Sequence, residues 1–186
     1  LVSSSAASDV YKRQLKFHDI PNTVNKAVAA AARLGVWMVN VHALGGRNMM
    51  IAAREALDEF SEARPQLIAV SILTSTDQSG LQEIGINKTV QQTVIDLTAM
   101  SIDCGIDGMV CSALEAQQIR TEFGERPLLV TPGIRPAGSS SDDQQRIMTP
   151  QKAIAAGSSY LVIGRPVTQH ANPLQQLEQI NDSLDE

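Results

Sequence analysis

The chain of 186 residues contains only two cysteines, Cys104 and Cys111, which are too few for a disulfide framework. It also lacks an apolar run of about 18 residues, so the sequence predicts no membrane-spanning helix. No basic start followed by an apolar stretch marks a secretory signal. These absences lead us to expect a protein of the reducing cytoplasm that binds no membrane.

Aromatic residues and excess basic charge are scarce as well. Aromatic side chains make up 3% of the chain, which leaves few platforms on which nucleic-acid bases could stack. The 15 Lys and Arg residues are outnumbered by 20 Asp and Glu, for a net charge of −5, so we expect no basic nucleic-acid surface. The apolar content of 43% and the charged content of 19% are typical of an ordinary globular domain.

Residues 1–14 differ from the remainder of the chain because they are rich in serine and show no hydrophobic period. They resemble read-through from an adaptor or a vector, and a disordered native tail is the alternative. We therefore expect residues 1–14 to be a non-native or disordered leader, and residues 15–186 to form the folded domain.

From residue 15 onward, short apolar strands alternate with helical segments. The expected strands cover residues 15–18, 36–41, 66–73, 108–111, 127–131 and 159–163. The expected helices cover residues 27–34, 52–60, 88–104, 113–123, 150–156 and 173–184, with Asn22 or Thr23 as the cap of the first. The sequence thus predicts six strand–helix units.

Such alternation predicts a parallel sheet with helices packed outside it, in an α/β fold. Two architectures are compatible with this pattern, an open doubly wound sheet and a closed (β/α)₈ TIM barrel. No G-x-G-x-x-G motif follows the first strand, which disfavours a dinucleotide-binding sheet. We expect an incomplete (β/α)₈ barrel, with about six units present and the first two missing.

Two similar motifs, G-I-R-P and I-G-R-P, follow the last two expected strands and predict a phosphate site. In (β/α)₈ enzymes the loops after the last strands often bind phosphate. Gly164 allows close approach of the backbone, and Arg135 and Arg165 offer guanidinium groups to phosphate oxygens. Gln144 adds an amide, and Thr74 ends the third expected strand at the same edge. Ordinary turn and surface roles remain the alternative for each of these residues.

The densest polar cluster surrounds the first expected strand. Lys16 lies within the strand, and Asp19 follows at its carboxyl end. A lysine held among carboxylates stays charged and can deliver a proton to a carbanion, although a simple Lys–Asp ion pair is the alternative. His18 and His42 follow the first two strands, and we interpret both as structural because ligand-spaced partners are lacking. The sequence predicts no metal site.

Five motifs together resemble the bacterial type of the orotidine 5′-phosphate decarboxylase family. They are L-K-F-H-D-I-P-N-T at 15–23, L-T-S at 73–75, T-P-G-I-R-P at 131–136, D-Q-Q-R-I-M-T-P at 143–150 and V-I-G-R-P at 162–166. The resemblance implies a homodimeric (β/α)₈ barrel that converts orotidine 5′-phosphate to UMP and CO₂ in pyrimidine biosynthesis. It also implies that neither a metal nor an organic cofactor takes part.

The resemblance also assigns roles to individual residues. It makes Lys16 the proton donor to C6 of the pyrimidine and Asp19 a catalytic residue contributed across the dimer interface. Substrate-binding residues implied in the same way are Ile20 and Thr23 at the interface, Thr74 at the pyrimidine, and Arg135, Gln144, Gly164 and Arg165 at the phosphate.

The chain departs from the family pattern at Gln14, where the family motif has an aspartate. The family also has a lysine and an aspartate on earlier strands that have no counterpart here. These departures predict impaired turnover by the chain as written. An inactive phosphate-ligand-binding fragment or pseudoenzyme, and a sister phosphate-sugar lyase of the same superfamily, are therefore the alternative functions.

Overall fold

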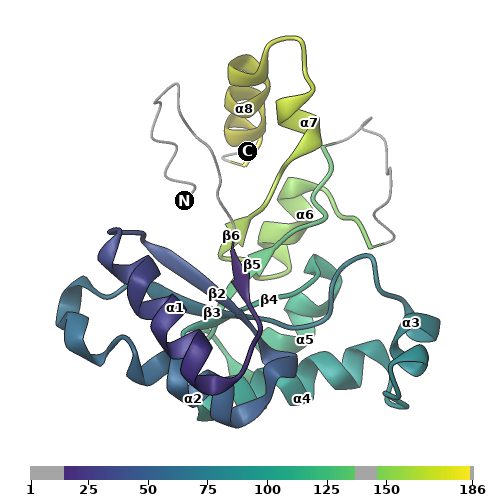
Figure 1. Cartoon of the computed structure of the whole chain (residues 1–186). Helices are drawn as coiled ribbons and strands as arrows, with labels where there is room; N and C mark the ends of the chain where they lie inside the picture. Colours follow the sequence, from purple (N-terminus) through teal and green to yellow (C-terminus); the bar gives the residue numbers. More distant parts are fainter. Residues whose placement is uncertain (1–14, 137–145, 185–186) are drawn as a thin grey trace.

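The computed structural model describes residues 15–136 and 146–184, and it contains a six-stranded parallel sheet (Figure 1). The strands are paired in the order in which they occur along the chain. They are β1 (Lys16–Phe17), β2 (Met38–His42), β3 (Gln66–Val70), β4 (Gly108–Val110), β5 (Leu128–Thr131) and β6 (Tyr160–Leu161). This sequential order lacks the reversal that defines a doubly wound sheet, and it is the order of barrel strands.

Helices connect successive strands, as parallel pairing requires. They are α1 (Pro21–Arg33), α2 (Gly46–Glu55), α3 (Gln78–Glu83), α4 (Val90–Asp103), α5 (Ala113–Phe123), α6 (Pro150–Ala155), α7 (Arg165–Thr168) and α8 (Pro173–Asp182), with short 3₁₀ segments at Ala43–Gly45 and Asp58–Ala63. Figure 1 shows α1, α2, α4 and α5 on one side of the sheet, and α7 and α8 apart from them at the top.

Local expectations were wrong in several places. Helix α2 covers Gly46–Glu55 instead of residues 52–60, and the short helix α7 after β6 was not expected. Helix α1 begins two or three residues earlier than a cap at Asn22 or Thr23 implies, because Pro21 occupies its first position and Ile20 is the N-cap. Strand β3 ends at Val70 instead of residue 73. The polar loop after it contains helix α3, whose N-cap Asp77 accepts a hydrogen bond from the Gly80 N–H.

The strand register separates two sets of side chains. Val39, Val41, Leu67 and Met109 point toward the helices, where they join the main hydrophobic core. The alternate positions Ile68, Val70, Val110 and Val130 pack together on the opposite face, which would be the interior of a barrel. Both faces of the sheet are apolar, as is usual for parallel sheets.

The sheet is curled rather than flat. In a flat sheet, four strand spacings of about 4.8 Å would separate β2 from β6 by roughly 19 Å. Instead, the ring centroids of Trp37, beside the start of β2, and Tyr160 in β6 are 5.4 Å apart. This contact across the inner face shows that the six strands bend toward one another. The described residues therefore form an incomplete barrel with β1 and β6 as its open edges.

Candidate active site

Parallel pairing brings the carboxyl ends of all six strands to one edge of the sheet. This edge carries the segments after β1, β3, β5 and β6, on which the sequence placed its candidate residues. In α/β proteins, binding and catalytic residues gather at this edge because each strand delivers a loop there.

Lys16 lies on the inner face of the sheet. It is in register with Asn40 of β2, while its neighbour Phe17 packs toward the helices. The rings of His18 and His42 stack nearby, with centroids 5.4 Å apart and an interplanar angle of 25°. Burial lowers the pKa of His42, and the positive charges of His18 and Lys16 lower it further. The carboxyl ends of β1 and β2 thus bring together the Lys16 ammonium and two imidazole rings, and the neutral form of His42 is favoured.

Asp19 and Ile20 follow Lys16 on an exposed turn that leads into α1, and Thr23 is exposed in the first turn of that helix. The Asp19 carboxylate accepts a hydrogen bond of 2.6 Å from the Ile20 N–H. Among the described residues, no ion pair joins Asp19 to Lys16, so the alternative of a Lys–Asp pair that holds the loop is not observed. Ile20 is 65% exposed.

Thr74 and Arg135 are both buried at the same edge, with exposed fractions of 8% and 7%. Arg135 follows β5, and its guanidinium donates a hydrogen bond of 2.9 Å to the Ile134 carbonyl. Its backbone N–H donates to the Met148 carbonyl, which connects the two ends of the segment after β5. Gln144 lies outside the described residues.

Gly164 and Arg165 follow β6, where Gly164 is the N-cap of the short helix α7 and Arg165 is its first residue. A Cβ atom placed on Gly164 would meet no atom within 4 Å, so the space above this backbone is open. An incoming group could therefore approach the Gly164 backbone closely. The loops after β5 and β6 bring the expected phosphate-binding residues Arg135, Gly164 and Arg165 to one end of the sheet.

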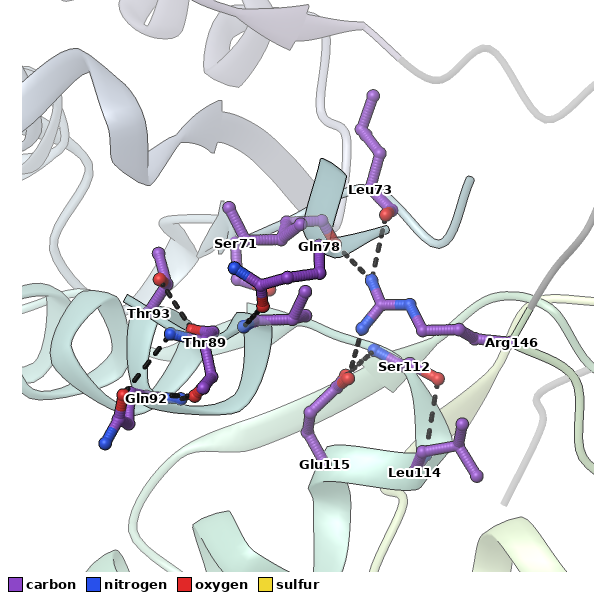
Figure 2. A network of polar contacts seen from close by, with 12 residues as sticks. Ser71, Leu73, Gln78, Thr89, Gln92, Thr93, Ser112, Leu114, Glu115 and Arg146 are labelled. Atoms are coloured by element: carbon purple, nitrogen blue, oxygen red, sulfur yellow. Dashed lines mark hydrogen bonds and ion pairs between the residues drawn. The ribbon is translucent and has the colours of Figure 1, made fainter. Parts of the chain in front are cut away.

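Sequence reasoning missed a charged residue with several polar contacts at this edge, Arg146 (Figure 2). Arg146 forms an ion pair with Glu115 of α5, and the two side chains are only 14% and 7% exposed. Its guanidinium also donates to the carbonyls of Ile72 and Leu73, just before Thr74. One side chain thereby joins the loops after β3, β4 and β5.

Glu115 is held from its other side by the start of its own helix. Its carboxylate accepts a hydrogen bond of 2.8 Å from the Ser112 N–H, and Ser112 and Glu115 together form a capping box. Burial raises the pKa of Glu115, whereas Arg146 and the Ser112 N–H act in the opposite direction. The S-x-x-E pattern at 112–115 was the available sequence signal, although it could not identify Arg146 as the partner.

Two kinds of site are not found in the part of the chain that the structure describes. No group of three or more His, Cys, Asp or Glu side chains there could hold a metal ion. Every helix in that part is too short or too polar to cross a bilayer. Cys104 and Cys111 are unpaired and buried, as expected for small apolar side chains.

Comparison with known proteins identifies relatives along almost the whole described chain. The model of the orotidine 5′-phosphate decarboxylase / HUMPS family matches residues 15–180. An orotidine 5′-phosphate decarboxylase of Pseudoalteromonas translucida is 58% identical over 171 residues, covering 92% of this chain and 73% of that protein. The corresponding protein of Vibrio campbellii is 59% identical over 170 residues, covering 91% of this chain and 73% of that protein.

Solved structures support the same relationship. The crystal structure of orotidine 5′-phosphate decarboxylase from Lactobacillus acidophilus superposes with a TM-score of 0.80 at 37% identity, covering 93% of this chain and 74% of that chain. The orotidine 5′-phosphate decarboxylase from Pyrococcus horikoshii superposes with a TM-score of 0.70 over 93% of this chain and 73% of that one. At 22% identity the second match concerns the fold alone.

The Arg146–Glu115 pair predicts strong coupling in a double-mutant cycle. Arg146→Met should lower the free energy of unfolding by about 3–5 kcal/mol, because it leaves a buried carboxylate without its counter-charge. Arg146→Met combined with Glu115→Gln should cost clearly less than the sum of the two single changes. Urea unfolding gives the free energy of unfolding of the unsubstituted chain, the two single variants and the double variant. The exposed pair Arg33–Glu59 supplies the control, since Arg33→Met should cost less than about 1 kcal/mol. Strict additivity would contradict this interpretation.

His42 predicts a pH dependence of stability. Its pKa is lowered in the folded state, so the unfolded chain binds the proton more readily. The contribution of His42 is therefore present above about pH 6.5 and is lost as the pH falls through the folded-state pKa. Urea unfolding between about pH 7 and pH 5 should show a shallower decline in His42→Asn than in the unmodified chain. His170→Asn, at an exposed histidine, is the control, and parallel curves for His42→Asn would refute the prediction.

Proposed function

Because the chain belongs to the orotidine 5′-phosphate decarboxylase / HUMPS family, we propose that it acts as an orotidine 5′-phosphate decarboxylase, a carboxy-lyase of pyrimidine biosynthesis. The observation that carries this proposal is the family match over residues 15–180, together with relatives of that name at 58–59% identity. A sister phosphate-sugar lyase is not favoured, because these relatives are named as decarboxylases.

The proposed reaction releases CO₂ from C6 of the pyrimidine and yields UMP. When the bond between C6 and the carboxylate carbon breaks, its electron pair stays on C6 as a carbanion. Lys16 then forms the new C6–H bond by donating an ammonium proton and becomes a neutral amine. A positive charge already in place at Lys16 stabilises the carbanion as it develops. His18 and His42 border this cluster, and Thr74 is the proposed contact to the pyrimidine.

The phosphate is assigned to the opposite side of the site. Arg135, Arg165, the Gly164 backbone and Gln144 are its proposed binding groups, and the open space above Gly164 supports this assignment. Phosphate is remote from C6, so its binding energy can serve to orient the pyrimidine in the transition state. We expect no metal and no organic cofactor to take part.

We infer a homodimer in which Asp19, Ile20 and Thr23 reach the neighbouring subunit's site. The exposed Ile20 side chain supports this inference, since contact with a partner would remove it from water. We also place the protein in the cytoplasm, which is consistent with its unpaired cysteines.

The domain is proposed to be residues 15–186, as part of a barrel with further strands, and residues 1–14 a leader outside it. The supporting observation is a curled sheet of six strands in sequential order, where the closed fold has eight. We therefore expect turnover to rise when this chain is joined to the part of the Pseudoalteromonas relative that has no counterpart in it, which is the part outside the 73% that matches. This joined chain is the appropriate protein for the activity measurements.

Lys16→Ala in the joined chain should abolish CO₂ release from orotidine 5′-phosphate, because the carbanion loses both its stabilising charge and its proton source. UMP should still bind, since its phosphate contacts are unchanged. Spectrophotometric turnover and calorimetric titration with UMP measure the two effects. Turnover by Lys16→Ala would remove Lys16 from the mechanism. UMP binding without turnover by the unsubstituted joined chain would favour the binding-only alternative.

Arg165→Ala should chiefly reduce kcat/KM for orotidine 5′-phosphate, by about two orders of magnitude, because a charge-assisted hydrogen bond to phosphate is lost. Turnover at a series of substrate concentrations gives kcat/KM. Arg126→Ala, at an exposed arginine beside the amino ends of the strands, is the matched control and should leave it unchanged. An unaltered kcat/KM in Arg165→Ala would refute the phosphate assignment.

A further inference from the structure

The strongest unexplained polar group in the described chain is the side-chain oxygen of Asn40. Asn40 is 8% exposed, and its Oδ1 atom is buried without a hydrogen-bond partner among the described residues. Buried amide oxygens are nearly always paired, because an unpaired acceptor has lost its water without compensation. The position of Asn40 therefore requires a donor that can reach it.

Strand geometry limits which donors these are. Asn40 is in register with Lys16 of β1 on one side and with Ile68 of β3 on the other. Residues at the same level of adjacent parallel strands project from the same face, so Asn40 shares the inner face with both. Ile68 has no donor, whereas the ammonium of Lys16 has three N–H donors and no acceptor of its own.

His42 is the other donor on this face, two residues along β2. The His42 ring is stacked on the His18 ring, so a face of the His42 ring, and not one of its N–H groups, points toward His18. Lys16 makes no hydrogen bond or ion pair with any described residue. An acceptor without a donor and a donor without an acceptor thus occupy adjacent strands at one level.

We propose that Asn40 is a positioning residue, whose amide oxygen accepts a hydrogen bond from the Lys16 ammonium and orients it for proton transfer. This inference rests on the role of Lys16 in the proposed function. An amide suits the task because it is neutral and does not take the proton from the ammonium. After Lys16 has given its proton to C6, the remaining N–H groups can still donate to the same oxygen.

Trapping of Lys16 by an amine-selective reagent tests the proposal without requiring turnover. Trinitrobenzenesulfonate reacts with the neutral amine, so an ammonium held by Asn40 reacts more slowly. Asn40→Leu, which keeps the side-chain volume and removes the acceptor, should speed trapping of Lys16 roughly fivefold, as expected for one net hydrogen bond. Asn40→Asp, which keeps an oxygen acceptor and adds charge, should slow trapping below that of the unsubstituted chain.

Peptide mass spectrometry separates the lysines and supplies internal references. Lys26 and Lys88 should react at the same rate in every variant, and Asn48→Leu, at an exposed asparagine of α2, should leave Lys16 unaffected. Equal Lys16 rates in folded Asn40→Leu and in the unsubstituted chain would overturn the proposal. If Asn40→Leu fails to fold, as judged by circular dichroism, an unchanged Lys16 rate in Asn40→Asp overturns it.

Kinetics in the joined chain provide a second readout that a purely structural role would not produce. Asn40→Leu should lower kcat while KM stays within about twofold, and Asn40→Asp should recover part of the lost kcat. A rise in KM with kcat unchanged would assign Asn40 to substrate binding and contradict the proposal. Failure of the joined unsubstituted chain to turn over would refute the proposed function alone, because the trapping result does not depend on it.

Discussion

The parallel register of the six strands is the constraint on which the rest of this structure depends. It aligns Lys16 with Asn40, Asn40 with Ile68, and His42 with Val70, so that every strand presents its carboxyl end at the same edge. A shift of one residue in any strand would move its lumen-facing side chains into the helix-packed core. Apolar residues on both faces oppose such a shift, because each face has its own buried cluster. Apolar packing therefore fixes the strand register, and the register in turn decides which side chains lie at the carboxyl edge of the sheet.

A second layer of control lies in the loops at that edge. In addition to apolar packing, a buried charge pair connects three of these loops through Arg146 and Glu115. The pair is specific because the Glu115 carboxylate also accepts a hydrogen bond from the backbone N–H of Ser112, the N-cap of α5, which fixes its orientation. A buried ion pair of this kind contributes little net stability compared with apolar packing, but its geometry is exacting. It keeps the Leu73–Thr74 turn beside the start of the segment that leads to α6.

The site is lined by several basic side chains. Lys16, His18 and His42 gather at the ends of β1 and β2, and arginines follow β5 and β6. A substrate that carries a phosphate and a carboxylate would supply the missing anions at both ends, which agrees with the family to which the chain belongs. Burial is the main cause of the lowered pKa of His42, and the neighbouring Lys16 and His18 lower it further because they disfavour another positive charge.

Much of this arrangement could be predicted from the sequence. Short apolar runs and helix signals are local, so the six units were found in the correct order, and α5 was placed at its observed bounds. Errors arose where local signals compete, as at Pro21, which displaces the expected caps, and in the polar loop where Asp77 begins α3. The motifs also placed the candidate residues at the ends of strands.

The sequence by itself determined the order of the elements and the chemical types available at the carboxyl edge, because these depend on neighbours within a few residues. Only the tertiary structure decided that Lys16 faces the inner side of the sheet level with Asn40, and that Arg146 meets Glu115, 31 residues away. Such pairings depend on strand register and on the paths of several loops. Many distant donors and acceptors are chemically equivalent in the sequence, and burial in the folded chain selects among them.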